Sequence, residues 1–217
     1  MTHLGLLGEY LKAGIAVFVL IDPLGAIPVY LSITPSYTAA EHRRTVKRIA
    51  VATTLILLGS LVIGGPTLDL LGIGIPAFRV AGGLLILLLA LDMMRPSPEG
   101  TRQTREQASE AAEKPDIAVI PMAMPILAGP GAIGAMIVYG HIKSTVVNYV
   151  VLTAVALVIG GSVWLALRLA APIGSRLGKT GINVLTRVMG LLLAAIAVEM
   201  AANGLRDLFP ALGTYTR

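Results

Sequence analysis

Long apolar stretches, separated by shorter polar ones, dominate the pattern of residues along this chain. Six of them approach or exceed the ~20 residues that an α-helix needs to cross a bilayer. They are Leu6–Leu31, Ile49–Leu71, Pro76–Met94, Ile117–Gly140, Val146–Ala171 and Ile182–Phe209. The pattern therefore predicts an all-α membrane protein with six transmembrane helices and the lipid bilayer as its surroundings.

Composition supports a membrane protein and removes several other classes. Hydrophobic residues make up 55% of the chain and charged residues only 13%, about half the charged share of a soluble domain. The chain has no cysteine, so disulfides, thiolate metal sites and a cysteine nucleophile are excluded. No motif of an enzyme, metal site or cofactor site stands out, and we expect none of these. The net charge of +5 does not indicate nucleic acid, because the cations lie beside apolar segments.

The distribution of cations predicts the orientation in the membrane. Lysine and arginine remain on the cytoplasmic side of membrane proteins. The stretches after the first, third and fifth apolar segments carry most of them: Arg43, Arg44, Lys47, Arg48, Arg95, Arg102, Arg105, Lys114, Arg168, Arg176 and Lys179. We therefore expect these stretches in the cytoplasm and both termini on the outer side of the membrane.

The two halves of the chain resemble each other. Gly-Ala-Ile triplets start at Gly25 and at Gly131, each within an apolar segment. The same offset relates Pro66 to Pro172 and Leu71-Gly72 to Leu177-Gly178. Each copy contains three predicted crossings, so the second copy enters the membrane from the opposite face. The sequence thus predicts two inverted three-helix repeats, residues 1–94 and 117–217, joined by a cytoplasmic linker, residues 95–116.

Proline and glycine interrupt the first and fourth segments near their middles. Proline removes a backbone donor and disturbs the preceding turn, and unwound backbone at membrane depth needs protein or water as a partner. Two half-helices that meet at a break offer amides for a carboxylate and carbonyls for an ammonium group, which suits a zwitterion. The alternative is a kink with close helix packing. The predicted substrate-binding residues are Asp22, Pro23, Gly25, Ala26, Pro28, Gly129, Pro130, Gly131 and Gly134.

Asp22 is the one acidic residue well inside a predicted segment. A carboxylate at such a position is costly and often functional, so Asp22 is our candidate for coupling to an ion or proton. It could equally cap the helix that follows the break. Asp92 and Glu199, near Arg95 and Arg206, are predicted to lie near an interface, where ion pairing suffices.

Three sequence runs resemble the signature of the MarC family: Ile21–Tyr30, Phe78–Gly83 and Pro125–Gly131. The resemblance covers nearly the whole chain and implies a six-helix inner-membrane protein. It also implies secondary transport of small neutral amino acids such as glycine and alanine, coupled to an ion gradient, either H+ or Na+. A passive small-solute channel and a non-transporting scaffold or regulator stay open as alternatives, as does a homo-oligomer.

Overall fold

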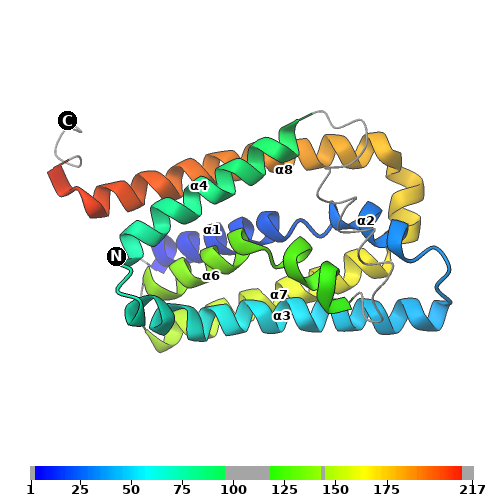
Figure 1. The fold of residues 1–217 in the computed structure, drawn as a ribbon, viewed down its shortest axis with the longest axis horizontal. Helices are drawn as coiled ribbons and strands as arrows, with labels where there is room; N and C mark the ends of the chain where they lie inside the picture. The colour runs from blue at the N-terminus through cyan, green and yellow to red at the C-terminus, as the bar shows by residue number, and fades with distance from the viewer. Residues whose placement is uncertain (1–2, 96–117, 143–144, 212–217) are drawn as a thin grey trace.

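The structure, a computed structural model, describes residues 3–95, 118–142 and 145–211, and within these ranges every regular element is helical (Figure 1). In chain order the elements are α1 (His3–Ile21), α2 (Ala26–Ile33), α3 (Ala39–Leu70), α4 (Ile75–Met94), η1 (Ala118–Leu127), α6 (Pro130–Ile142), α7 (Val146–Arg168) and α8 (Ala170–Leu208). The predicted all-α class is confirmed.

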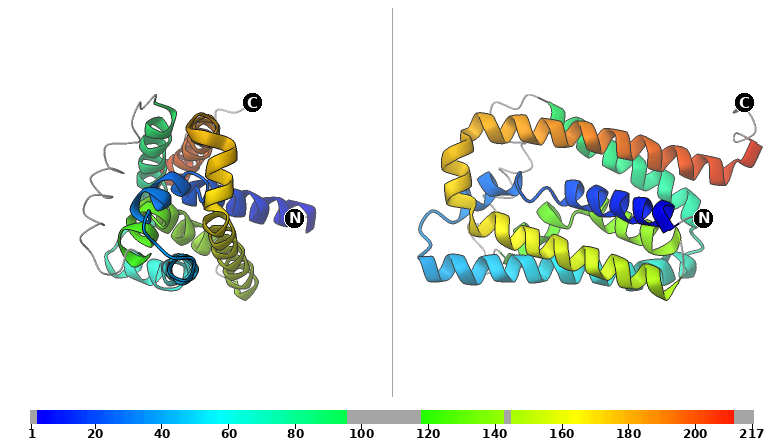
Figure 2. Two further views of the ribbon diagram at one scale, coloured as in Figure 1. Left: turned by 90° about the vertical axis from the view of Figure 1, so that its right-hand side faces the viewer. Right: turned by 180° about the vertical axis from the view of Figure 1, so that it is seen from behind.

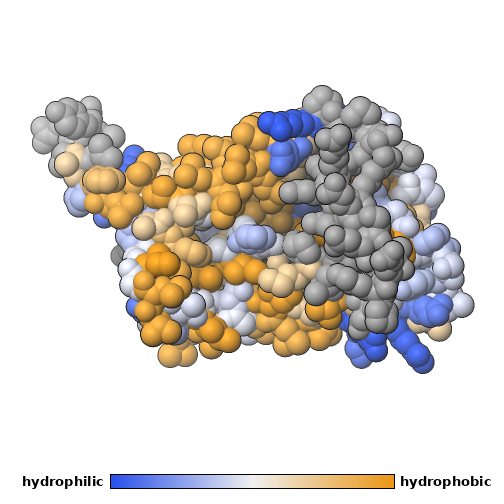
Figure 3. Space-filling model, in the orientation of Figure 1, coloured by the Kyte–Doolittle hydropathy of each residue, from blue (hydrophilic) through white to orange (hydrophobic). Residues whose placement is uncertain are grey.

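Five stretches among the described residues are long and apolar enough to cross a membrane: Gly8–Ile33, Ala39–Leu70, Ile75–Met94, Val146–Arg168 and Thr180–Leu208. The fourth predicted segment, which began at residue 117 outside the described ranges, is divided between η1 and α6. Neither of these elements, with 10 and 13 residues, is long enough alone. Large apolar side chains cover much of the outer surface (Figure 3), as contact with lipid requires.

Local sequence signals explain where the helices begin. Thr38 and Glu41 form a capping box at the start of α3: the Glu41 N–H donates to Thr38 Oγ1 (3.3 Å), and the Thr38 N–H donates to Glu41 Oε2 (2.7 Å). At the start of α7, Thr145 Oγ1 accepts from the N–H of Asn148 (3.3 Å). The two capping threonines therefore occupy matching places in the two halves.

Left-handed backbone occurs at matching places too. Among the described glycines, Gly72 (φ +68°) and Gly178 (φ +60°) have positive φ, the region that glycine adopts without steric cost. Their separation along the chain equals that of the two Gly-Ala-Ile triplets. Gly72 ends the turn after α3, and Gly178 kinks α8, so the membrane-spanning part of α8 follows it.

The last helix of each half packs against the other, and the contacts are reciprocal. A Cβ placed on Gly83 of α4 would lie 2.8 Å from the carbonyl oxygen of Ala197 in α8. A Cβ placed on Gly190 of α8 would lie 3.0 Å from the carbonyl oxygen of Ala90 in α4. The two glycines are separated along the chain by the same number of positions as the two alanines. Small residues thus allow the two antiparallel backbones to approach closely (Figure 1).

One long helix is continuous in the first half of the chain and interrupted in the second half. α3 continues for 32 residues with Pro66 inside it. Its counterpart ends as α7 at Arg168, short of the predicted Ala171, and the chain bends at Leu169 (φ −96°, ψ 14°). The first part of α8 then crosses the end of the bundle before Gly178 turns the chain back (Figures 1 and 2). α1 begins and α8 ends at the same end of the bundle, which we call the terminal end.

Candidate functional site

The predicted break in the first segment is confirmed. α1 ends at Ile21, Asp22 has a positive φ of 40°, and α2 begins at Ala26. Asp22 holds the intervening turn with both its side chain and its backbone: Oδ1 accepts from the N–H of Gly25 (3.0 Å), and its carbonyl accepts from the N–H of Ala26 (3.1 Å). The carboxylate therefore satisfies a backbone donor in the turn before α2. The N-cap of α2 is Gly25, without a side-chain cap, and not Asp22 as the capping interpretation predicted.

Gly25 leaves room for that carboxylate. A Cβ at residue 25 would overlap Oδ2 of Asp22. Any side chain at this position would force the Asp22 carboxylate to shift from the place at which it accepts the backbone hydrogen bond. The Asp-Pro-Leu-Gly run is therefore a local unit in which the aspartate and the glycine depend on each other.

The break in the fourth segment is also confirmed, but it is built differently. η1 is a π-helix that ends at Leu127, and α6 begins at Pro130. The N–H of Ala128 donates to the carbonyl of Ala123, five residues earlier (2.8 Å), and the N–H of Ile133 donates to the carbonyl of Gly129 (3.1 Å). Ala128 occupies the place that Asp22 has in the first half, so only the first break carries a carboxylate.

The structure brings the two interrupted segments together in the core. α1 contacts both η1 and α6, and α2 contacts η1. A Cβ on Gly131 would lie 3.1 Å from Cδ2 of Leu20 and 3.4 Å from Cγ1 of Ile86. A Cβ on Gly134 would meet the ring of Phe78 at 3.9 Å, an ordinary contact. Gly131 is thus a position at which the second break packs closely against α1.

The predicted binding residues differ in burial. Pro23, Ala26 and Gly134 are buried, and Asp22, Gly25, Gly129 and Gly131 are partly exposed. Pro28 and Pro130 lie on the outer surface, so their side chains do not line the interior. Their effect in this arrangement is on the backbone, since proline cannot donate a hydrogen bond.

The first break lies at membrane depth. Asp22 falls near the middle of the apolar stretch Gly8–Ile33. At ~1.5 Å per helical residue, about 21 Å of this stretch precede Asp22 and about 17 Å follow it. An ionisable group at such a position has few reasons to be present other than function.

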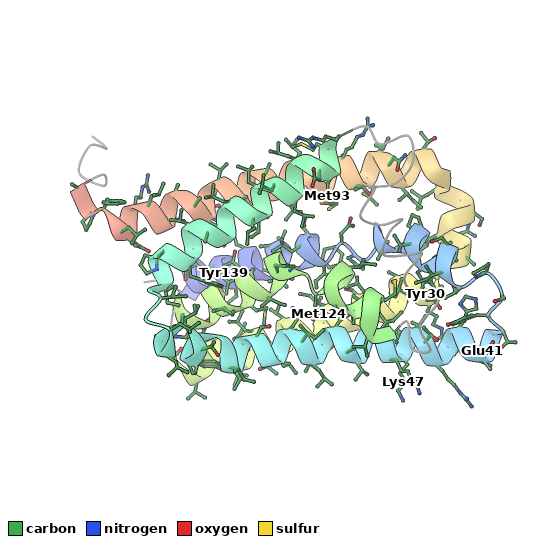
Figure 4. All side chains as sticks on the ribbon, viewed as in Figure 1. Tyr30, Glu41, Lys47, Met93, Met124 and Tyr139 are labelled. Atoms are coloured by element: carbon green, nitrogen blue, oxygen red, sulfur yellow. The ribbon has the colours of Figure 1, made fainter. Side chains whose placement is uncertain are left out.

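A cavity that the sequence did not predict opens at the terminal end of the bundle. Its volume is about 490 Å³, and residues of α1, α4, α6, α7 and α8 line it. We call it the terminal cavity. Its ionisable and polar lining residues are Glu9, Tyr10, Lys12, Arg79, Tyr139, Asn148, Glu199 and Asn203; Figure 4 labels Tyr139 among them. These residues lie far apart along the chain, and no sequence motif connects them.

Ion pairs join the helices around this cavity. Nζ of Lys12 on α1 lies 3.5 Å from Oε1 of Glu199 on α8, and Nη1 of Arg79 on α4 lies 2.7 Å from Oδ2 of Asp207 on α8. The sequence suggested Arg206 as the neighbour of Glu199, and the structure instead pairs Glu199 with a residue of the other half. The expected neighbour of Asp92 is confirmed, since Arg95 lies 3.4 Å away.

Apolar side chains separate the terminal cavity from the two breaks. On α1 the cavity lining ends at Ala16, which is about 9 Å along the helix from Asp22. Val17 is 0% and Leu20 6% exposed, and Ala132 and Met136 of α6 are 2% and 0% exposed. These residues belong to one continuous core cluster. In this conformation the breaks are therefore closed off from the terminal cavity.

Comparisons with known proteins agree over nearly the whole chain. A family described as MarC family integral membrane protein matches residues 7–209. The UPF0056 membrane protein YhcE of Escherichia coli is 38% identical over 94% of this chain and 94% of its own length. UPF0056 membrane protein MJ1677 of Methanocaldococcus jannaschii is 37% identical over 91% of this chain and 96% of its own length. YvbG of Bacillus subtilis, also named a UPF0056 membrane protein, is 37% identical over 91% of this chain and 94% of its own length. No solved structure matches.

Proposed function

The chain belongs to the MarC family of integral membrane proteins, and from its candidate site we propose that it is a secondary transporter of small neutral amino acids. The substrates we propose are glycine and alanine, moved across the prokaryotic inner membrane by alternating access and coupled to H+ or Na+. One observation carries the proposal: each half contributes an interrupted helix, and the two interruptions pack against each other in the core. Paired broken helices at membrane depth are typical of transporter binding sites.

The backbone around the breaks supplies the chemistry that a zwitterion needs. α1 and η1 end at the breaks and direct their last carbonyls there, and α6 begins at the second break and directs its first amides there, whereas the first amides of α2 already donate to Asp22 and Leu24. Free helix amides favour a carboxylate, and free carbonyls favour an ammonium group or a cation. Glycine and alanine residues leave room for a substrate to approach this backbone. Asp22, with a carboxylate at this depth, is our proposed coupling residue for the ion or proton.

The reciprocal contacts support an inverted repeat. Gly83 meets Ala197, and the matching Gly190 meets Ala90, which is the pattern that a two-fold axis produces. Because α4 and α8 are antiparallel, the axis implied by this pattern runs across the helices, in the plane of the membrane. We propose residues 1–94 and 117–217 as the two repeats. The linker between them, residues 95–116, lies outside the described residues except for Arg95.

The difference between the halves suggests how access could alternate. Transporters with inverted repeats change sides when the repeats exchange conformations around a fixed site. Here α3 is one continuous helix, and its counterpart is interrupted at Leu169, three residues before Pro172. The matching residue in α3 is Ile63, three residues before Pro66. In the opposite state we expect α3 to bend near Ile63 and α7 to continue straight through Leu169.

The positions of the cations support the proposed orientation. Arg43, Arg44 and Lys47 are exposed at the start of α3, and Arg168 and Arg176 lie near the end of α7 and the start of α8. The start of α3, the end of α7 and the start of α8 lie at the end of the bundle opposite the terminal end (Figure 1), and Figure 4 labels Lys47 in that part of α3. Since cytoplasmic segments are rich in lysine and arginine, we propose that this end is cytoplasmic and that the terminal end faces the periplasm.

The test is counterflow in proteoliposomes with glycine or alanine, with and without a gradient of H+ or Na+. The proposal expects saturable exchange and uphill accumulation that depends on one of the gradients. Downhill flux that never saturates would indicate a pore instead. Absence of flux for every small neutral amino acid, with protein shown to be folded, would overturn the proposed transport and leave the scaffold or regulator as the alternative.

A further inference from the structure

We propose that the terminal cavity is a second binding site, at which a small zwitterion is held by Lys12 and Glu199 before it reaches the breaks. This inference rests on the proposed transport function, because it assigns the cavity as the periplasmic entrance of the same pathway. The ligand it would take is a neutral amino acid with one carboxylate and one ammonium group.

The depth of the charged residues is the first argument. Lys12 lies inside the apolar stretch Gly8–Ile33, and Glu199 lies inside Thr180–Leu208. From the nearer end of each stretch, they are about 6 and 13 Å along the helix. Ionisable side chains at such depths face a water-filled cavity or a partner rather than lipid. The side chains of Lys12 and Glu199 are 73% and 61% exposed and both line the terminal cavity, so a ligand in the cavity can reach them.

The presence of both charges in the lining is the second argument. Two bases, Lys12 and Arg79, and two acids, Glu9 and Glu199, line the cavity. A site with both signs offers a partner to each end of a zwitterion, whereas a simple anion or cation can use only one of them. Arg79 is already held by Asp207 at 2.7 Å. Lys12 and Glu199 are therefore the pair that we assign to direct binding.

The geometry of the Lys12–Glu199 ion pair allows a ligand to replace it. At 3.5 Å and in contact with solvent, the ion pair contributes little to stability. A zwitterion can give its carboxylate to Lys12 and its ammonium group to Glu199, so that neither side chain loses a charged partner. This exchange would also loosen the connection between α1 and α8, which belong to different halves.

The size and walls of the cavity limit the ligand to small molecules. Its volume of about 490 Å³ equals that of roughly sixteen liquid water molecules, enough for a small amino acid with its hydration shell. Ala13, Ala16 and Ala195 form part of the wall. Beyond Ala16 the buried core closes the path, so a ligand in the cavity stops short of Asp22.

The experiment uses the natural absence of cysteine, since a single introduced thiol will be the only one in the chain. Ala195→Cys places it in the cavity wall, and Ala202→Cys places a matched control on the same helix, exposed and outside the lining. Both are reacted with a membrane-impermeant maleimide added to the periplasmic side of oriented vesicles. The rates are compared in the presence of glycine, acetate and methylamine, the last two of which carry only one of the charges of glycine.

We expect the maleimide to label Ala195→Cys, and glycine at twice its dissociation constant to slow this labelling by about threefold. Glycine leaves the labelling of Ala202→Cys unchanged, and acetate and methylamine give little protection. When Lys12→Gln or Glu199→Gln is added to Ala195→Cys, labelling persists and protection by glycine is lost. Thermal unfolding of each variant checks that it is folded.

Three results would overturn the inference: no effect of glycine on labelling, equal protection by acetate or methylamine, or full protection in the Lys12 and Glu199 variants. The last result would mean that glycine acts from the breaks by changing the conformation. The labelling experiment and the counterflow experiment can fail independently of each other. Protection without counterflow would retain the site and reject transport, and counterflow without protection would do the reverse.

Discussion

The exchange of conformations between the two halves makes Pro66→Ala a sharp test. Pro66 lies inside the continuous helix α3, where proline removes a hydrogen bond and clashes with the preceding turn at a cost of ~3 kcal/mol or more. Alanine removes this cost in the present conformation. In the opposite state we expect α3 to bend at Ile63, three residues before Pro66. Pro66 would then lie in the first turn of the helix that follows the bend, where proline is tolerated. The substitution therefore stabilises only one of the two states.

The expected effect is large. A difference of ~3 kcal/mol corresponds to about a hundredfold change in an equilibrium constant, so the opposite state of Pro66→Ala should be about a hundredfold less populated. We expect a higher melting temperature, slower glycine exchange and more complete labelling of Ala195→Cys from the periplasmic side. Rates of counterflow and of maleimide labelling in the same vesicles measure the effect.

Pro172→Ala is the matched control with the opposite sign. Pro172 lies in the first turn after the bend at Leu169, and it would become an interior residue if α7 continued straight. Alanine at position 172 should favour the opposite state and reduce labelling of Ala195→Cys. The double variant should return toward the wild-type balance. The same direction of change for Pro66→Ala and Pro172→Ala, or wild-type exchange in both, would refute the exchange of conformations.

Three further predictions follow from contacts at the breaks and at the helix packing. Asp22→Asn keeps an oxygen that can accept the backbone hydrogen bond at the break, so the protein should fold. Because the carboxylate is lost, uptake should no longer depend on the ion gradient. Unchanged coupled uptake would remove this carboxylate from the mechanism. Gly83→Ala and Gly190→Ala should each lower stability by about 1–3 kcal/mol, because a Cβ would press on backbone of the opposing helix. The larger loss is expected for Gly83→Ala, whose Cβ would lie 2.8 Å from a backbone oxygen against 3.0 Å for Gly190→Ala. Gly59→Ala, with nothing within 4 Å, should instead raise stability by about 0.5–1 kcal/mol, and thermal unfolding in detergent compares the three. Asn148→Ala should cost about 1–3 kcal/mol, because its side chain donates to two carbonyls at the end of α6 (3.0 and 3.1 Å); a melting temperature equal to that of the wild type would contradict this assignment.

Much of the architecture was readable from the sequence because a bilayer restricts what a chain can do. Apolar stretches of sufficient length must form helices there, since lipid offers no partner for backbone groups. Proline and glycine act locally, so the breaks after Ile21 and Leu127 could be located from residue type alone. The offset between the two halves likewise located matching glycines, Gly72 and Gly178, which share a positive φ.

Other features depended on how distant residues meet. The sequence predicted a helix through Ala171, but the chain bends at Leu169, three residues before Pro172. Proline alone does not decide this, because α3 continues without interruption through Pro66 at the matching place. The partner of Glu199 is Lys12, near the other end of the chain, because α1 and α8 enclose the same cavity. Local chemistry determined the helices and their interruptions. Only the tertiary packing decided which charges face one another, since that depends on distances between helices that no spacing along the chain encodes.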